Sequence, residues 1–239
     1  MKKTLGAIAL LGSVVVASNA QAGCNNLPTH ADLKAALKNA QKLDNGGFAL
    51  NMWATLVDRD GIVCAVAFTG AGRGAQWPGS RVISAQKANT ANAFSLPTLP
   101  LSTANLYTAV QPGGSLFGLQ ESNPVDISVA YGGSAANFGQ PQDPMVGRRI
   151  VGINVFGGGL ALYNAAGTLV GAIGVSGDSS CADHNIAWRT RQNLALDHIP
   201  GGVVNNTDGI DYTPGSGWGH PVCSAGAKTV ALAIGAGKS

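Results

Sequence analysis

The sequence predicts an α+β fold in which helices flank an antiparallel sheet. Two pairs of apolar, β-forming segments each surround a short turn of the kind that closes a hairpin. After each pair, a loop or a polar turn leads to a segment in which apolar residues recur at helical spacing. Because hairpin, loop and helix occur in this order twice, an antiparallel sheet is favoured over a doubly wound parallel one.

Residues 1–22 have the three parts of a secretory signal peptide. Two lysines precede an apolar run at 5–17, and the small residues Ala20 and Ala22 mark a cleavage site. The apolar run is shorter than the about 18 residues of a membrane span, and no later segment reaches that length. We therefore expect a periplasmic or secreted protein that has no membrane contact after cleavage.

The first predicted elements are a helix, a hairpin and a second helix. Apolar residues recur at helical spacing within 30–43, and Thr29 is a candidate N-cap. Residues 48–57 and 62–68 flank the turn DRDG and predict an antiparallel hairpin. Residues 80–95 contain many small side chains, which predict a helix that packs tightly on the sheet.

A long segment rich in proline and glycine, at about 96–148, interrupts the regular pattern. Structureless loops of this length are uncommon in compact domains. We therefore expect short elements near 101–107 and 127–131, or a segment that covers a pocket or a subunit contact.

Strand patterns return after the insertion. Residues 149–156 are apolar and β-forming, and 160–163 and 168–175 flank the turn NAAG as a second hairpin. The next segment, 182–196, has helical spacing.

The end of the chain is predicted to be mostly loop. A Gly-rich segment at about 200–227 precedes KTVALAIG, which predicts a short final strand at 228–235. Residues 23–239 are expected to form a single domain.

All four cysteines lie in the part of the chain that we expect to be exported. An even number of cysteines in such a chain indicates two disulfides, with three possible pairings. We favour Cys181 with Cys223, because this bond would pin the Gly-rich tail to a helix start. Cys24 would then pair with Cys64.

The charge pattern excludes a nucleic-acid partner. The net charge of +3 includes Lys2 and Lys3 of the expected signal peptide. The remaining charges are nearly balanced and form no basic stripe.

The stretch GVSGDSSCADH, residues 174–184, combines several reactive side-chain types. It differs from the G-x-S-x-G motif of hydrolases because Asp178 stands where the last glycine is required. Ser180 and Asp183 have the spacing of a helix-capping pair, and Asp178 or Ser179 can serve as the cap in a similar way. The stretch is therefore first of all a junction between a strand and a helix.

His184 is the residue of this stretch that capping does not explain. It falls in the first helical turn, with Trp188 and Arg191 further along the same face. Its imidazole suits a metal or haem iron, and it equally suits a hydrogen-bonded place in the core. Both interpretations stay open at this point.

Two segments carry a resemblance to a known family. ISAQKANTANAF, residues 83–94, contains a Lys-Ala-Asn-Thr-Ala helix motif, and residues 157–188 form a Gly-rich hairpin that ends in Gly-Val-Ser-Gly. In these segments the chain resembles the GlcG/HbpS family of haem-binding proteins, which is related to the PduO-type C-terminal domain. The resemblance covers 31–95 and 149–196, so the insertion and the tail are additions to it.

The resemblance implies a profilin-like fold with a five-stranded antiparallel sheet between helices, a homo-oligomer, and haem or a related small molecule as ligand. The ligand-binding candidates are His184, Thr90, Lys87, Trp188, Arg191 and Asp183, with His184 also the candidate metal ligand. Trp188, Phe94 and Phe117 are expected to form the apolar walls of the haem pocket. The haem propionates are expected to meet Arg191, Arg73 or Lys87.

Two other functions remain possible on the sequence alone. One is a small-molecule enzyme in which Asp178, Asp183 and His184 act in acid/base or metal roles. The other is an oligomeric accessory protein without catalysis, whose apolar insertion makes subunit contacts.

Overall fold

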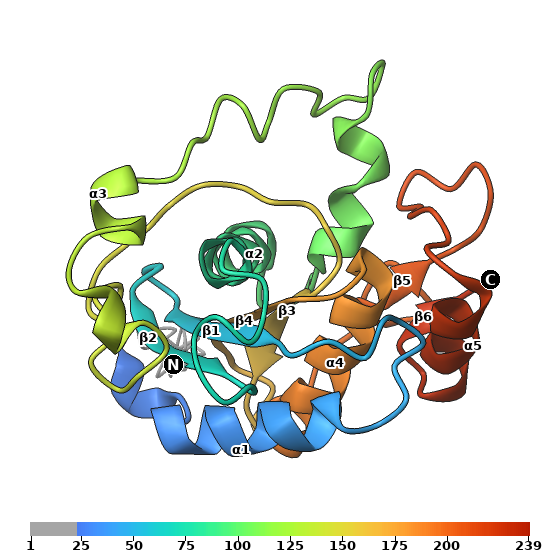
Figure 1. Ribbon diagram of the computed structural model, residues 1–239. Helices are drawn as coiled ribbons and strands as arrows, with labels where there is room; N and C mark the ends of the chain where they lie inside the picture. The colour runs from blue at the N-terminus through green and yellow to red at the C-terminus, as the bar shows by residue number, and fades with distance from the viewer. Residues whose placement is uncertain (1–22) are drawn as a thin grey trace, which may run out of the picture.

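The core of the protein is a four-stranded antiparallel sheet, seen in a computed structural model that describes residues 23–239 (Figure 1). The expected signal peptide lies outside the described residues. The strands are β1 (Trp53–Asp58), β2 (Val63–Phe68), β3 (Gly159–Tyr163) and β4 (Leu169–Ser176), in the order β2-β1-β4-β3. Both predicted hairpins are present, and they join through β1 and β4, where Leu56 lies opposite Ile173.

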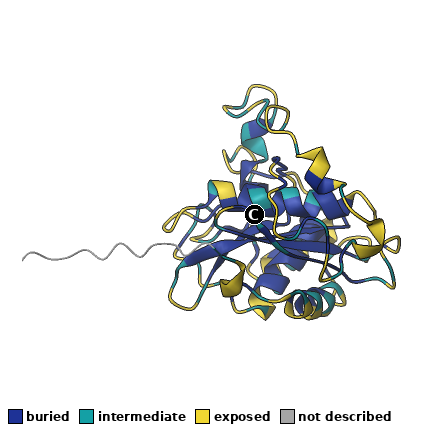
Figure 2. Cartoon of the chain, turned by 90° about the vertical axis from the view of Figure 1, so that its left-hand side faces the viewer, coloured by how far each residue is buried: buried dark blue, intermediate teal, exposed yellow. Residues whose placement is uncertain are grey.

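Helices cover both faces of this sheet, which confirms the α+β class. Helix α2 (Ser80–Phe94) lies on one face, and α1 (His30–Gln41) and α4 (Ser180–Asn193) lie on the other (Figure 1). Side chains of β1 alternate between the two layers. Trp53 and Val57 pack on the α2 side, whereas Ala54 and Leu56 pack on the opposite side. Figure 2 shows the buried sheet between its helices.

Helix α2 approaches β4 so closely that one position of the strand must be glycine. A Cβ atom on Gly174 would lie 1.9 Å from the Ser84 carbonyl oxygen and 2.5 Å from the Ala88 nitrogen. The Ser84 hydroxyl also forms a 2.8 Å hydrogen bond with that of Thr55. The first glycine of the Gly-Val-Ser-Gly motif thus has a packing role, and the tight helix predicted from small residues is confirmed.

Helix α1 begins with a reciprocal cap at Thr29, as expected. The Thr29 backbone N–H donates to the Asp32 carboxylate over 3.0 Å, and the Asp32 N–H donates to the Thr29 hydroxyl over 3.3 Å. Loss of such a cap costs about 1 kcal/mol. We predict that Thr29→Ala lowers the free energy of unfolding by this amount in urea denaturation. Ser115→Ala, at an exposed loop position, is the control and should change it by less than about 0.5 kcal/mol; equal losses would contradict the capping role.

The insertion passes over α2 and contains several short helices (Figure 1). Two of them, η2 (Thr103–Leu106) and α3 (Ile127–Ala130), fall where short elements were expected. Two more, η3 (Thr108–Val110) and η4 (Ala135–Asn137), lie outside the expected ranges. A buried ion pair between Arg81 of α2 and Asp143 fastens the insertion to the core.

The main sheet lacks the fifth strand expected from the resemblance. The prediction that residues 149–156 form a strand was therefore wrong. Val151 and Gly152 have φ angles of 52° and 81°, in the left-handed region, which interrupts an extended chain. Backbone N–H groups here bond to side chains and loops instead of a neighbouring strand. For example, the Asn154 N–H donates to the Thr90 hydroxyl over 2.9 Å.

The prediction of a strand at 228–235 was also wrong, because this apolar run lies largely in helix α5 (Ala225–Ala233). Short apolar runs fit either structure, and here the Ser224 hydroxyl caps the helix by accepting from the Ala227 N–H over 3.0 Å. After α5, β6 (Gly237–Lys238) pairs in parallel with β5 (Ile210–Asp211) in a separate two-stranded sheet.

Two disulfides fasten the ends of the described chain to the core. Cys24, in the short helix η1 (Cys24–Asn26), is bonded to Cys64 of β2, and Cys181 of α4 is bonded to Cys223 in the tail. This is the pairing that we favoured from the sequence.

Candidate functional site

Two of the predicted site residues, Lys87 and Asp183, meet in a buried ion pair. The Lys87 ammonium of α2 lies 2.7 Å from the carboxylate of Asp183, in the first turn of α4, and 3.0 Å from the Val175 carbonyl oxygen. Burial raises the pKa of Asp183 to about 6 and lowers the pKa of Lys87. The pair therefore joins α2, β4 and α4 where the Gly-Val-Ser-Gly motif ends.

Asp178 is held by backbone hydrogen bonds beside this pair. Its carboxylate accepts from the N–H groups of Phe48, Leu50 and Ser179. Its own N–H donates to the Asp183 carboxylate over 2.8 Å. In this arrangement, Asp178 fixes the loop before β1 to the start of α4.

A cleft of about 190 Å³ opens above the ion pair. We call it the Lys87 cleft. It is lined by residues of α2, of the β4–α4 junction and of two loops: Trp77, Ser80, Ile83, Lys87, Phe156, Ser176, Asp178, Ser180 and Asp183. Because it contains both charged and aromatic groups, it suits a small polar ligand.

His184 points away from the Lys87 cleft and is completely buried. Its Nε2 lies 3.2 Å from the carbonyl oxygen of Ala236, and within residues 23–239 its Nδ1 has no hydrogen-bond partner. Burial lowers the pKa of the imidazole to about 3, so the ring is neutral at pH 7. The structure thus brings Asp178 and Asp183 to one cleft but places His184 against the C-terminal segment.

Thr90, Arg191 and Trp188 are also buried. The Thr90 hydroxyl donates to the Gln86 carbonyl oxygen over 2.8 Å. The Arg191 guanidinium donates to the Asp208 carboxylate over 2.6 and 2.8 Å and lies 4.7 Å from the ring centre of Trp188. These side chains connect parts of the core.

The other expected ligand contacts differ in exposure. Phe94 is half-buried, whereas Phe117 is 67% exposed. Arg73 is exposed and forms no hydrogen bond or ion pair within the described part of the chain. Of the three expected propionate partners, Arg73 is therefore the one with a free cationic group.

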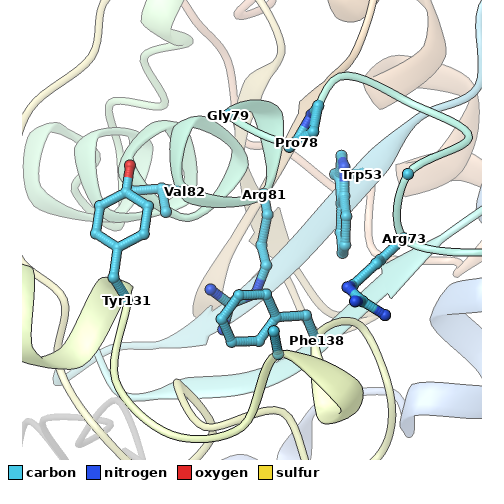
Figure 3. Close-up of a pocket in the computed structure, with 10 residues that line it drawn as sticks. Trp53, Arg73, Pro78, Gly79, Arg81, Val82, Tyr131 and Phe138 are labelled. Atoms are coloured by element: carbon cyan, nitrogen blue, oxygen red, sulfur yellow. The ribbon is translucent and has the colours of Figure 1, made fainter.

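Arg73 lies at a second pocket, of about 360 Å³, which sequence reasoning missed. We call it the Trp53 pocket. Its walls come from the start of β1, the start of α2 and the insertion, and Figure 3 shows Tyr131 and Trp53 on opposite sides of Arg81. The Arg81 guanidinium stacks 3.7 Å from the ring centre of Phe138. No sequence pattern joins β1 to the insertion, so only the folded chain reveals this pocket.

A family model described as "Haem degrading protein HbpS-like" matches residues 30–191. The chain belongs to this HbpS-like family. The match confirms the family expected from the sequence. The matched range contains the main sheet and every residue that lines the Lys87 cleft or the Trp53 pocket.

Several solved structures are similar to this HbpS-like protein, and the first of those described next shares its fold. A PduOC:Heme complex is 22% identical and covers 72% of this chain and 98% of its own, with a TM-score of 0.50. ORFY of Klebsiella pneumoniae is 24% identical over 70% of this chain and 90% of its own, with a TM-score of 0.47. A double mutant of Streptomyces reticuli HbpS is 16% identical over 80% of this chain and 99% of its own, with a TM-score of 0.44. The curated proteins give no match.

Proposed function

We propose that this HbpS-like protein binds haem non-covalently in the Trp53 pocket. The observation that carries the proposal is an aromatic pocket with an unpaired arginine at its rim, in a chain of a haem-related family. Haem is a flat apolar ring with two carboxylates at one edge. It therefore requires apolar walls together with positive charge on one side.

The residues of the Trp53 pocket fit these requirements. Its volume of about 360 Å³ lies within the range of small-molecule sites. Trp53, Val82 and Phe138 supply apolar surface, and Arg73 supplies a cation for a propionate. The hydroxyl of Tyr131, which is 58% exposed, is a type of group that binds haem iron. Bound haem would supply a redox-active iron at this position.

His184 remains the alternative iron ligand that the sequence suggested. Its contact with Ala236 and its complete burial mean that haem would reach it only after the C-terminal segment moved. The two assignments can be separated by variants.

We predict that haemin gives a saturable shift of the Soret band with the full mature protein. Tyr131→Phe should shift the band position and weaken binding about tenfold, because the iron loses an oxygen ligand. Arg73→Gln should weaken binding up to about fivefold, the effect of one exposed charge contact. Absorption titrations measure both effects.

Arg149→Gln is the matched control for Arg73→Gln, because Arg149 is also exposed but lies outside the pocket. It should leave the titration unchanged. Loss of binding in His184→Ala with no effect in Tyr131→Phe would move the site to His184. A wild-type protein without a saturable shift would eliminate the haem proposal.

Export and assembly into homo-oligomers also remain predictions. Two disulfides favour an oxidising compartment. No helix within residues 23–239 combines the length and the apolar character that a membrane crossing requires. The prediction of assembly comes from the family resemblance, because single exposed apolar side chains such as Phe48 and Ile127 are normal on a protein surface.

A further inference from the structure

A serine and a histidine from distant parts of the chain meet at the edge of the Lys87 cleft. The Ser180 Oγ lies 2.8 Å from Nε2 of His220, and Nδ1 of His220 lies 2.8 Å from the Pro221 carbonyl oxygen. A carbonyl oxygen only accepts, so Nδ1 carries the proton in this contact. Nε2 is then the acceptor, and the Ser180 hydroxyl donates to it.

The serine and the histidine are held in place on both sides. Cys181 directly follows Ser180 and is bonded to Cys223, which lies in the same loop as His220. The imidazole packs 4.8 Å from the ring centre of Tyr107, and the Ser180 oxygen also accepts from the Gly157 N–H over 2.7 Å. A fixed serine, a fixed base and a third group that orients the base are the elements of an activated nucleophile.

Small molecules can approach this pair from two sides. Ser180 is half-buried and lines the Lys87 cleft. His220 lines a different cavity, of about 480 Å³, which lies between Tyr107 and the tail and is distinct from the Trp53 pocket. The hydrogen bond therefore lies between two hollows and not inside a packed core.

The groups around the pair set the protonation of His220 and place a cation at the Lys87 cleft. Burial and the nearby Lys87 charge lower the pKa of His220 to about 4, while the Pro221 hydrogen bond raises it. The imidazole is therefore neutral at pH 7, with Nε2 unprotonated, and is a weaker base than an ordinary histidine. Of the three N–H groups of Lys87, two are used by Val175 and Asp183. The third can donate to negative charge that develops on a bound carbonyl oxygen.

We propose that Ser180 and His220 act as nucleophile and general base on short-chain carboxylic esters bound in the Lys87 cleft. The Ser180 oxygen forms a bond to the ester carbonyl carbon while its proton passes to Nε2 of His220. The ester C–O bond then breaks, and the leaving alcohol takes that proton. Water, deprotonated by the same nitrogen, releases the acid and restores the serine. The cleft volume of about 190 Å³ limits the acyl group to a short chain.

The test is covalent labelling of the full, disulfide-bonded protein with a small fluorophosphonate, followed by peptide mass spectrometry. Wild-type protein should be modified at Ser180, and Ser180→Ala should lose this label. His220→Gln should slow the labelling at least about 100-fold, the usual contribution of a general base. Hydrolysis of p-nitrophenyl acetate should fall in parallel.

Ser115→Ala, at an exposed position outside both cavities, is the control and should label at the wild-type rate. Circular dichroism shows whether each variant is folded. An unlabelled Ser180 in the folded wild-type protein would overturn the proposal without reference to any variant. Equal labelling rates in His220→Gln and wild type would also overturn it, since the histidine would then be only a structural contact.

Discussion

Asp143→Asn is expected to lower the free energy of unfolding by about 3–5 kcal/mol, because it leaves a buried guanidinium without its counter-charge. The side chains of Arg81 and Asp143 are 2% and 0% exposed, so water cannot replace the lost partner. The Arg81 Nε donates to the Asp143 carboxylate over 2.8 Å, and a second contact joins the guanidinium to the other oxygen. Urea denaturation monitored by tryptophan fluorescence measures the loss.

The effect should extend to the Trp53 pocket, because Asp143 also organises the insertion. Its carboxylate accepts from the N–H groups of Gly139 and Met145, next to Phe138 in the pocket wall. Asp60→Asn changes an exposed aspartate and is the matched control, with an expected change below about 0.5 kcal/mol. Similar losses in the two variants would show that the buried ion pair does not anchor the insertion.

Lys87→Met is expected to destabilise the protein by about 3–5 kcal/mol at pH 8, and by less at pH 5. Without the ammonium, the Asp183 carboxylate is buried with no counter-charge. Its pKa, already raised to about 6 by burial, should rise further, because Lys87 is the main group that lowers it.

The sign of the pH dependence follows from the direction of this shift. Below the ordinary pKa of 3.8, Asp183 is protonated in both the folded and the unfolded chain, so its ionisation does not lower the free energy of unfolding. As the pH rises toward the folded-state pKa, the unfolded chain ionises first and stability is lost. In the wild type this loss ends near pH 6, whereas in Lys87→Met it continues above pH 6.

Urea denaturation at pH 5 and pH 8 therefore tests the pair. Lys87→Met should have a lower free energy of unfolding than wild type at both pH values. The difference should be about 1–3 kcal/mol larger at pH 8 than at pH 5. Lys42→Met, at an exposed position, should show no such change between the two pH values. A deficit in Lys87→Met that is equal at both pH values would mean that Asp183 does not titrate in this range.

Much of the local structure followed from the sequence, because its causes lie within a few residues. The cap at Thr29, the turns of the two hairpins and the small side chains of α2 all act over one or two turns of chain. The HbpS-like family was also recognisable from two continuous segments.

Where the local signal was ambiguous, tertiary contacts decided the structure. Residues 149–156 have strand-forming side chains, but Thr90 and the insertion satisfy their backbone, and Val151 adopts a left-handed conformation. His184 has the chemistry of a metal ligand, but the C-terminal segment covers it.

The sequence by itself determined the α+β class, the family and the residue types available for chemistry. Only the tertiary structure decided which of them meet: Lys87 with Asp183, Trp53 with Phe138, and Ser180 with His220. The physical reason is the distance along the chain over which each kind of interaction acts. Hydrophobic periodicity and capping act between neighbours along the chain, whereas each of these encounters requires the packing of elements that lie far apart in it.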